Sequence, residues 1–242
     1  MRSLTEVLVA ANRKYGKRLG WQLKRYQADF YTARKHLIAL HRPTLAIDGG
    51  ANEGQWAQEF RMNNEGIPIV SFEPVTGPYL KAKNLKLPHH RVEKLALGSR
   101  DCSLHIHISS NSAMSSSLAK PTGHLRAFPQ VTFTETQPVQ CVRLDAFPEF
   151  VKERIWLKLD LQGYEWEALL GASRLLQSTV GIGIETSLTE NYEGEKQSHE
   201  IIGFLGELGF RPFHIFAPGI AESGAMNYLD ILFSRDSEKS NV

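Results

Sequence analysis

The sequence has few cysteines and no long hydrophobic run, and each absence excludes a class of protein. Cys102 and Cys141 are the only thiols among its 242 residues. Two thiols are too few for a disulfide framework or a zinc cluster, and they suit a reducing compartment. No stretch approaches the roughly 20 apolar residues that span a membrane, and the N-terminus lacks the apolar core of a signal peptide. We therefore expect a cytoplasmic protein without a transmembrane segment.

The chain also has little net charge, but its charges are unevenly distributed. The formal net charge is +2, with 28 Lys or Arg and 26 Asp or Glu residues. Nine of the basic residues but only two of the acidic ones lie within residues 1–40, so the remaining chain is net acidic. A basic arm suits RNA or another anionic partner, whereas a solvated helical face beside an acidic domain is the commoner arrangement. We favour the second interpretation and expect no nucleic-acid partner.

Residues 1–40 are mostly good helix formers without proline, so we interpret them as a basic helical N-terminal extension. These helices are also candidates for a homo-oligomer contact. Residues 41–242 then form the main domain, which is long enough for one substantial core.

Within the main domain, short apolar runs alternate with helical patterns. Such alternation predicts an α/β fold with a mainly parallel, doubly wound sheet. The runs 210–218 and 226–235 come last and predict a C-terminal antiparallel hairpin, an arrangement associated with class I methyltransferases. The other strand candidates are 44–48, 68–72, 91–97, 155–160 and 180–185, and the helix candidates are 54–64, 76–86, 163–177 and 198–208.

Residues 98–143 interrupt this alternation. Two strand-like runs, LHIHIS and PVQCVRL, flank the Ser-rich stretch SSNSAMSSSLAKPTGHLRAF. Long irregular segments inside a compact domain are usually functional or disordered. The stretch is therefore either a lid over a ligand, with Ser115 to Ser117 supplying hydroxyls, or a mobile solvent loop.

A glycine-rich turn, IDGGANEG, follows the first predicted strand. In open α/β sheets, ligands bind outside the carboxyl ends of the strands, where this turn lies. Gly49 and Gly50 permit a tight backbone, and Gly54 lets the next helix approach the strand. The spacing of Gly49, Ala51 and Gly54 is a degraded GxGxxG pattern of NAD-binding proteins, with Glu73 near the position of the ribose-binding acid.

The acid directly before this turn argues against a diphosphate. Asp48 would repel phosphate, but it suits a ligand with a cationic amino-acid end, which describes S-adenosylmethionine. In that interpretation Asp48, Gly50, Asn52 and Gly54 form a methyltransferase glycine motif. Glu73, at the end of the second strand, accepts both ribose hydroxyls. Helix capping is the alternative role of Asp48 and Glu73.

Four segments resemble the FkbM-type methyltransferase family: IDGGANEGQWA, SFEPVTGPYLKAKNL, EKLALGSRD and LKLDLQGYEWEALLGA. Gln162 replaces a more frequent Glu, and Ser99 stands where an acid usually follows the glycine. The resemblance implies a Rossmann-like class I domain that transfers a methyl group from S-adenosylmethionine, generally to a hydroxyl of a sugar, polyketide or related small molecule. It also implies donor contacts at Glu53, Ala96 and Leu97, which lie within these segments.

A protonated alcohol is a poor nucleophile, so a base near the acceptor oxygen should accelerate methyl transfer by roughly 10²–10⁴-fold. Asp160 is the leading candidate, because it ends the strand IWLKLD at the same sheet edge as the glycine-rich turn. Glu165 follows in the first turn of the next helix, where it either assists Asp160 or only complements the helix dipole. His199 and His214 are secondary candidate bases, since histidine titrates near neutrality.

Lys158 and Glu185 belong to the same edge. Asp160 and Glu185 form only a pair of carboxylates without a third ligand, so we expect no required metal. The expected function is that of an S-adenosylmethionine-dependent O-methyltransferase with a small-molecule or glycan acceptor. The alternatives are an RNA methyltransferase that uses the basic N-terminus, a non-catalytic donor-binding scaffold protein and, last, a nicotinamide oxidoreductase.

Overall fold

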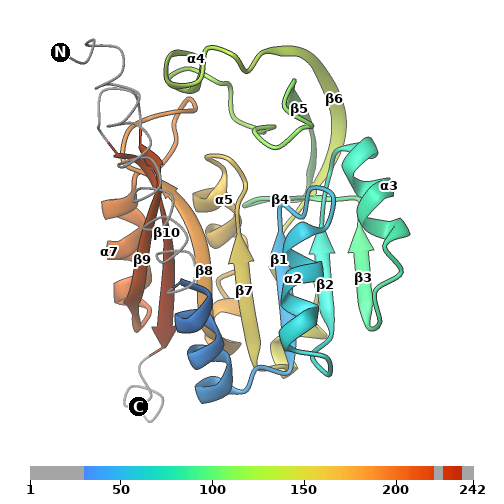
Figure 1. Ribbon diagram of the computed structural model, residues 1–242, viewed down its shortest axis with the longest axis vertical. Coiled ribbons are helices and arrows are strands. Elements are labelled where there is room, and N and C mark those ends of the chain that lie inside the picture. The colour runs from blue at the N-terminus through green and yellow to red at the C-terminus, as the bar shows by residue number, and fades with distance from the viewer. Residues whose placement is uncertain (1–29, 221–225, 236–242) are drawn as a thin grey trace, which may run out of the picture.

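Seven strands form the central sheet of the computed structural model, which describes residues 30–220 and 226–235 (Figure 1). The strands are β1 (Leu45–Gly49), β2 (Ile69–Phe72), β3 (His90–Glu93), β7 (Ile155–Leu159), β8 (Thr179–Ser187), β9 (Phe210–Ile220) and β10 (Met226–Arg235). Their order in the sheet is β3-β2-β1-β7-β8-β10-β9. The first five of these are mutually parallel, whereas β10 is antiparallel to both of its neighbours. The predicted mainly parallel sheet with a C-terminal antiparallel hairpin is confirmed.

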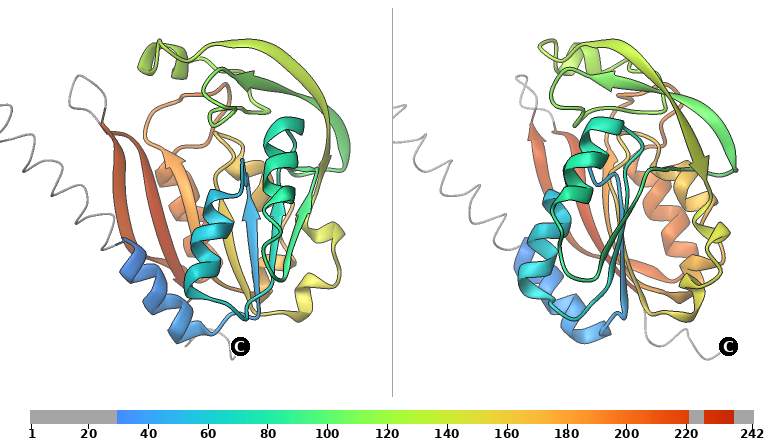
Figure 2. Two further views of the ribbon diagram at one scale, coloured as in Figure 1. Left: turned by 45° about the vertical axis from the view of Figure 1, so that its right-hand side comes forward. Right: turned by 90° about the vertical axis from the view of Figure 1, so that its right-hand side faces the viewer.

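Helices cover both faces of this sheet, as a doubly wound fold requires (Figure 2). The strands of the sheet centre are buried on both faces, which explains why they read as continuous apolar runs. On one face Leu37, Phe60 and Trp156 are fully buried together, and on the other Leu157, Leu169 and Leu205 are. The first face carries residues 30–41, α2 (Gln55–Asn63) and α3 (Thr76–Asn84), and the second carries α5 (Glu165–Leu170), α6 (Leu175–Ser178) and α7 (Ser198–Glu207).

The predicted single helix over 163–177 is wrong, because α5 and α6 are separate helices. At the break, the end of α5 approaches another part of the backbone closely. A Cβ at Gly171 would lie 2.0 Å from the carbonyl oxygen of Gly98, so only glycine permits this contact.

A second, three-stranded sheet in the order β4-β6-β5 stands beside the first. Its strands are β4 (Ala96–Leu97), β5 (Cys102–Ser109) and β6 (Phe133–Val142). The predicted single strand over 91–97 is therefore wrong: β3 belongs to the central sheet, and β4 leaves it to pair with β6. Cys102 and Cys141 are register partners across β5 and β6, and both are free thiols.

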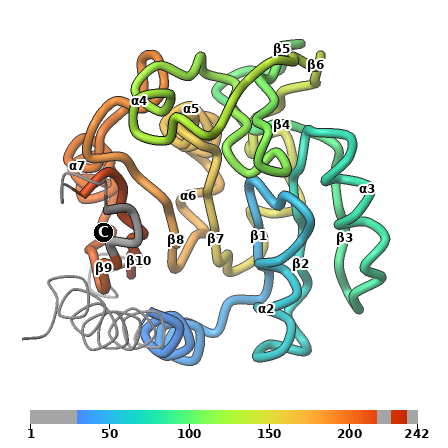
Figure 3. Tube along the Cα trace, turned by 45° about the horizontal axis from the view of Figure 1, so that its top comes forward, coloured from blue at the N-terminus to red at the C-terminus, as the bar shows by residue number. Residues whose placement is uncertain are grey.

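The Ser-rich stretch lies between β5 and β6 and continues into α4 (His124–Ala127). Segment 110–131, which we call the lid, arches over the carboxyl ends of the central strands (Figures 1 and 3). Backbone amides of Thr122 and His124 donate to the carbonyl oxygen of Asn191, at 3.0 and 2.9 Å. The lid is thus tied to the loop that joins β8 and α7. After β6, two 3-10 turns, η1 (Leu144–Ala146) and η2 (Phe150–Lys152), lead to β7.

The helix over residues 30–41 crosses the predicted boundary at residue 40, and Leu37 and Ile38 are part of the core. The rest of the predicted N-terminal extension, with its expected homo-oligomer contact, lies outside the described residues. None of the described helices is both long and apolar enough to cross a membrane.

Candidate functional site

A cavity of about 630 Å³, which we call the first cavity, opens at the carboxyl ends of β1, β2 and β7, beneath the lid. Here β1 has β2 on one side and β7, which comes much later in the chain, on the other. This is the topological switch point of the sheet, where open α/β folds bind their ligands. The cavity is lined by the glycine-rich turn, by the ends of several strands, by the lid and by the loop after β8.

The glycine-rich turn bends as its sequence predicts. Gly50 lines the cavity and has a φ of +74°, and a Cβ there would lie 1.8 Å from the carbonyl oxygen of Asp160. Gly54, with a φ of +87°, precedes α2, and a Cβ there would lie 2.5 Å from the side chain of Leu85. Gly49 and Gly54 do not line the cavity. Both glycines therefore shape the turn, while Gly50 faces the ligand space.

Glu73 follows β2, and two backbone amides fix the orientation of its carboxylate. Its Oε1 accepts the amide of Val75 and its Oε2 accepts the amide of Asn52, both at 2.8 Å. Each oxygen keeps a free lone pair, and Glu73 lines the cavity although it is only 6% exposed. Burial raises the pKa of Glu73 to about 7, while the two amide hydrogen bonds act in the opposite direction. Ala96 and Leu97 supply an apolar wall of the same cavity.

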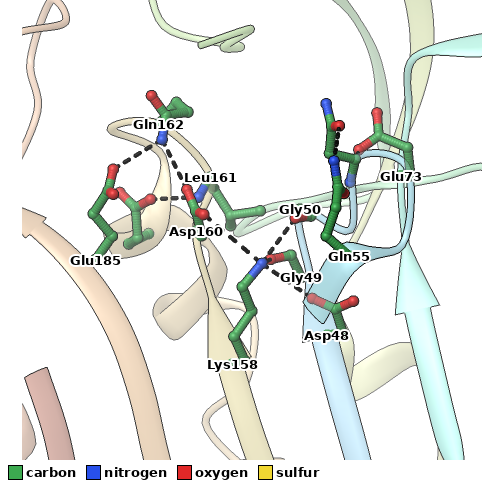
Figure 4. A network of polar contacts seen from close by, with 12 residues as sticks. Asp48, Gly49, Gly50, Gln55, Glu73, Lys158, Asp160, Leu161, Gln162 and Glu185 are labelled. Atoms are coloured by element: carbon green, nitrogen blue, oxygen red, sulfur yellow. Dashed lines mark hydrogen bonds and ion pairs between the residues drawn. The ribbon is translucent and has the colours of Figure 1, made fainter. Parts of the chain in front are cut away.

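Asp48 lies beneath the turn (Figure 4). It is fully buried and does not line the cavity. One of its oxygens accepts from the Ser71 hydroxyl at 3.0 Å, and the other lies 3.0 Å from the Nζ of Lys158. Lys158 also donates to the carbonyl oxygens of Gly49 and Gly50, at 3.1 and 2.8 Å. Burial lowers the pKa of Lys158, but the neighbouring carboxylates, Asp48 first, raise it more. Asp48 therefore acts on the cavity indirectly, by fixing a charged lysine against the turn.

Asp160 belongs to a group of three neighbouring carboxylates, Asp160, Glu185 and Asp230, which we call the carboxylate row. Gln162 donates through its Nε2 to Asp160 Oδ1 and to Glu185 Oε1, both at 2.8 Å (Figure 4). Asp230 is the register partner of Glu185 across β8 and β10. Burial, followed by the neighbouring carboxylates, raises the pKa of Glu185 well above its ordinary value and that of Asp230 to about 7. Near neutral pH, this pair therefore retains a proton.

Glu165 does not line the cavity. It accepts the backbone amides of Leu161 and Gly163, the latter at 3.0 Å. These bonds brace the turn that carries Asp160 and Gln162. Burial raises the pKa of Glu165 to about 8. The structure thus gives Glu165 a positioning contact rather than access to a ligand.

Three other residues singled out from the sequence also lie outside the cavity. His199 is exposed in the first turn of α7. His214 lies on β9, where its ring packs against Phe30 with centroids 6.0 Å apart. Glu53 forms an ion pair with Lys81 at 2.6 Å. The structure does not bring any of the three to the carboxylate row.

The cavity contains polar groups that the sequence analysis missed. His124 of the lid is buried with its ring against Tyr192, and burial lowers its pKa, so it is neutral at pH 7. Tyr228 reaches the cavity from β10, where Asp230 lies two residues further along the same face of the strand. The charged and aromatic residues at alternate positions of an otherwise apolar strand were the available signal. Among the described residues, no cluster of three His, Cys, Asp or Glu side chains is arranged to hold a metal.

These residues fit S-adenosylmethionine. The free lone pairs of Glu73 match a ribose diol, and the wall of Ala96 and Leu97 suits an adenine ring.

Comparison with known proteins agrees with this fit. The model of the methyltransferase FkbM domain matches residues 48–212. The chain is also 26% identical over 186 residues to 2-O-methyltransferase NoeI of Sinorhizobium fredii (strain NBRC 101917 / NGR234), covering 71% of this chain and 75% of that protein.

Solved structures with a similar architecture have low identity to this chain. Magnesium protoporphyrin IX methyltransferase of Synechocystis PCC 6803, with bound SAM, is 10% identical, with a TM-score of 0.43 over 87% of this chain and 84% of that one. The Burkholderia thailandensis 1,6-didemethyltoxoflavin-N1-methyltransferase is 12% identical, with a TM-score of 0.40 over 98% of this chain and 92% of that one. The family assignment follows from the family model, which matches more than half of the 242 residues. The chain therefore belongs to the FkbM methyltransferase family.

Proposed function

We propose that the protein transfers the methyl group of S-adenosylmethionine to a hydroxyl oxygen of a small molecule or glycan. The observation that carries the proposal is the carboxylate of Glu73, which lines the cavity with one lone pair free on each oxygen. The name of the relative NoeI, a 2-O-methyltransferase, supports oxygen as the acceptor atom. A cytoplasmic location, as expected from the sequence, is part of this proposal.

In the proposed reaction the protein aligns the acceptor and removes its proton. S-adenosylmethionine, when bound, supplies an electrophilic methyl group. Asp160 accepts the hydroxyl proton, since it lines the cavity and, among the described residues, only Gln162 donates a hydrogen bond to its carboxylate. Gln162 holds Asp160 and Glu185 in a fixed relation, and Glu165 holds the turn from behind. The lid excludes water from the reacting atoms.

Two variants test the separate roles of Glu73 and Asp160. Glu73→Ala should weaken binding of S-adenosylhomocysteine by roughly 100-fold, because two hydrogen bonds to a charged group are lost. Asp160→Asn should change this affinity little, but it should lower turnover by roughly 10²–10⁴-fold. Isothermal titration gives the affinities, and a mass-shift assay against hydroxylated glycans and lipids gives turnover.

Glu93→Ala is the matched control for the ribose contact, because Glu93 ends the neighbouring strand β3 but does not line the cavity. Unchanged affinity in Glu73→Ala would refute the ribose contact. Tight donor binding without methyl transfer to any acceptor would instead indicate a scaffold protein.

A further inference from the structure

A second cavity of about 410 Å³ adjoins the first, on the sheet face that residues 30–41 and α2 cover. The two cavities are immediate neighbours, because six residues line both of them. The shared residues are Gln55, Trp56, Lys158, Asp160, Glu185 and Tyr228. Glu73 and the apolar wall of Ala96 and Leu97 line only the first cavity. The second cavity therefore begins where the donor groups end, at the carboxylate row.

The shape of the second cavity follows from a glycine in β8. Gly183 lies in the strand row between Lys158 of β7 and Leu232 of β10, and it contributes no side chain there. A Cβ at Gly183 would have as its nearest neighbour the Leu232 side chain, at 3.4 Å, which is ordinary contact. The hollow above Gly183 is thus open space within the sheet face.

Aromatic rings and carboxylates line this hollow. The rings come from the helix over residues 30–41, α2, β7 and the C-terminal hairpin, and they are Phe30, Tyr31, Trp56, Trp156, Phe216 and Tyr228. Asp160, Glu185 and Asp230 lie side by side at the end of β7 and on β8 and β10, and Glu59 of α2 also lines the hollow. Rings present flat apolar surfaces, and carboxylates are strong hydrogen-bond acceptors.

The two cations of this lining are already engaged. Lys158 pairs with Asp48 and donates to two backbone carbonyls. Arg34 pairs with Glu59 and lies over the rings of Tyr31 and Trp56. Among the described lining residues, no cation is left to bind a phosphate, and the carboxylates would repel one.

The carboxylate row is not a strong cation site either. The Glu185 and Asp230 pair retains a proton near neutral pH, and Lys158 lies 3.9 Å from Asp160. The surface therefore combines hydrogen-bond acceptors with one shared donor, and it keeps a negative charge that Lys158 balances only in part. The hydroxyl groups of a ligand form hydrogen bonds with the carboxylates of such a surface, while the aromatic rings pack against the apolar face of the same ligand.

We propose that the second cavity is the acceptor subsite and that it binds an uncharged, polyhydroxylated ring, as in a sugar residue, with one hydroxyl presented to Asp160 and Glu185. This inference rests on the proposed function, because it names the substrate class of the same site. Phosphorylated and carboxylated acceptors are excluded by the carboxylate row.

The test uses the full chain, saturated with S-adenosylhomocysteine, and a panel of neutral methyl glycosides with their matched sugar phosphates. Saturation-transfer NMR should detect binding of the neutral glycosides to the protein and no binding of the sugar phosphates. Gly183→Val should abolish glycoside binding, because its side chain occupies the hollow above position 183. Asp230→Asn should weaken it by about tenfold, the effect of one hydrogen bond. Both variants should retain the affinity for S-adenosylhomocysteine, because neither residue lines the first cavity.

Asp101→Asn is the matched control, because Asp101 lines neither cavity. A thermal melt shows whether Gly183→Val is folded. If Gly183→Val is unfolded, Asp230→Asn still tests whether the second cavity binds the glycoside. Wild-type chain that binds S-adenosylhomocysteine but no neutral glycoside, or binds phosphates equally well, would overturn the inference. Loss of S-adenosylhomocysteine affinity in Gly183→Val would assign the second cavity to the donor and also overturn it. Failure of the wild type to bind S-adenosylhomocysteine would instead refute the proposed function.

Discussion

At the scale of single residues, two acids that look equivalent in the sequence have different tasks. Asp48 and Glu73 both follow buried strands near the switch point. Glu73 lines the cavity with free lone pairs, whereas Asp48 is ion-paired with Lys158 beneath the turn. The sequence placed both at the correct sheet edge. It could not show that Lys158, 110 residues later, would compensate the charge of Asp48.

Loss of that lysine should therefore cost stability. Lys158→Met leaves Asp48 buried without its counter-charge, so we expect the free energy of unfolding to fall by about 3–5 kcal/mol. Urea unfolding measures this value. The double variant Asp48→Asn with Lys158→Met should recover part of the loss. Lys81→Met, which breaks the exposed pair with Glu53, should change stability little. Equal losses in the two lysine variants would contradict the role of Lys158.

Candidate catalytic residues were predictable only where they end strands. Asp160 and Glu185 follow apolar runs, and the structure brings them within reach of one glutamine side chain. His199 and His214 lie outside the cavity, since no local pattern tells which way a histidine points from α7 or β9. His124, which does line the cavity, comes from an irregular segment whose position depends on contacts with the loop after β8.

At the scale of elements, the apolar runs predicted most strands and helices correctly. The errors occurred where tertiary contact decides the outcome. Residues 91–97 read as one strand, but β4 turns away to pair with β6, a partner about 45 residues later in the chain. The predicted helix over 163–177 is interrupted after Leu170, where Gly171 meets the backbone of Gly98. Neither partner is visible in a local window of sequence.

The lid offers an element-scale prediction. A Cβ at Gly123 would lie 2.0 Å from the carbonyl oxygen of Glu190. Gly123→Ala should therefore push the lid away from the loop that joins β8 and α7. We expect faster hydrogen exchange at Thr122 and His124 and affinity for S-adenosylhomocysteine weakened by about tenfold, or roughly 1.4 kcal/mol. The melting temperature should change little, because the sheet core is untouched. Gly77→Ala, with no atom within 4 Å of the added Cβ, is the control. Unchanged exchange in Gly123→Ala would show that this contact does not hold the lid.

At the scale of the whole molecule, the sheet topology assembles the site from distant segments. The switch point between β1 and β7 places the glycine-rich turn, Glu73 and Asp160 around one cavity, although they span more than a hundred residues of sequence. The C-terminal hairpin then adds Tyr228 and Asp230 beside Glu185. The proposed donor and acceptor sites thus share a single boundary, the carboxylate row.

The structure of the full chain in complex with S-adenosylhomocysteine tests this account most directly. We expect the ribose hydroxyls within hydrogen-bond distance of both Glu73 oxygens, the adenine against Ala96 and Leu97, and the sulfur directed toward Asp160 and Glu185. A ribose bound away from Glu73, or a nucleoside lodged in the second cavity, would contradict it.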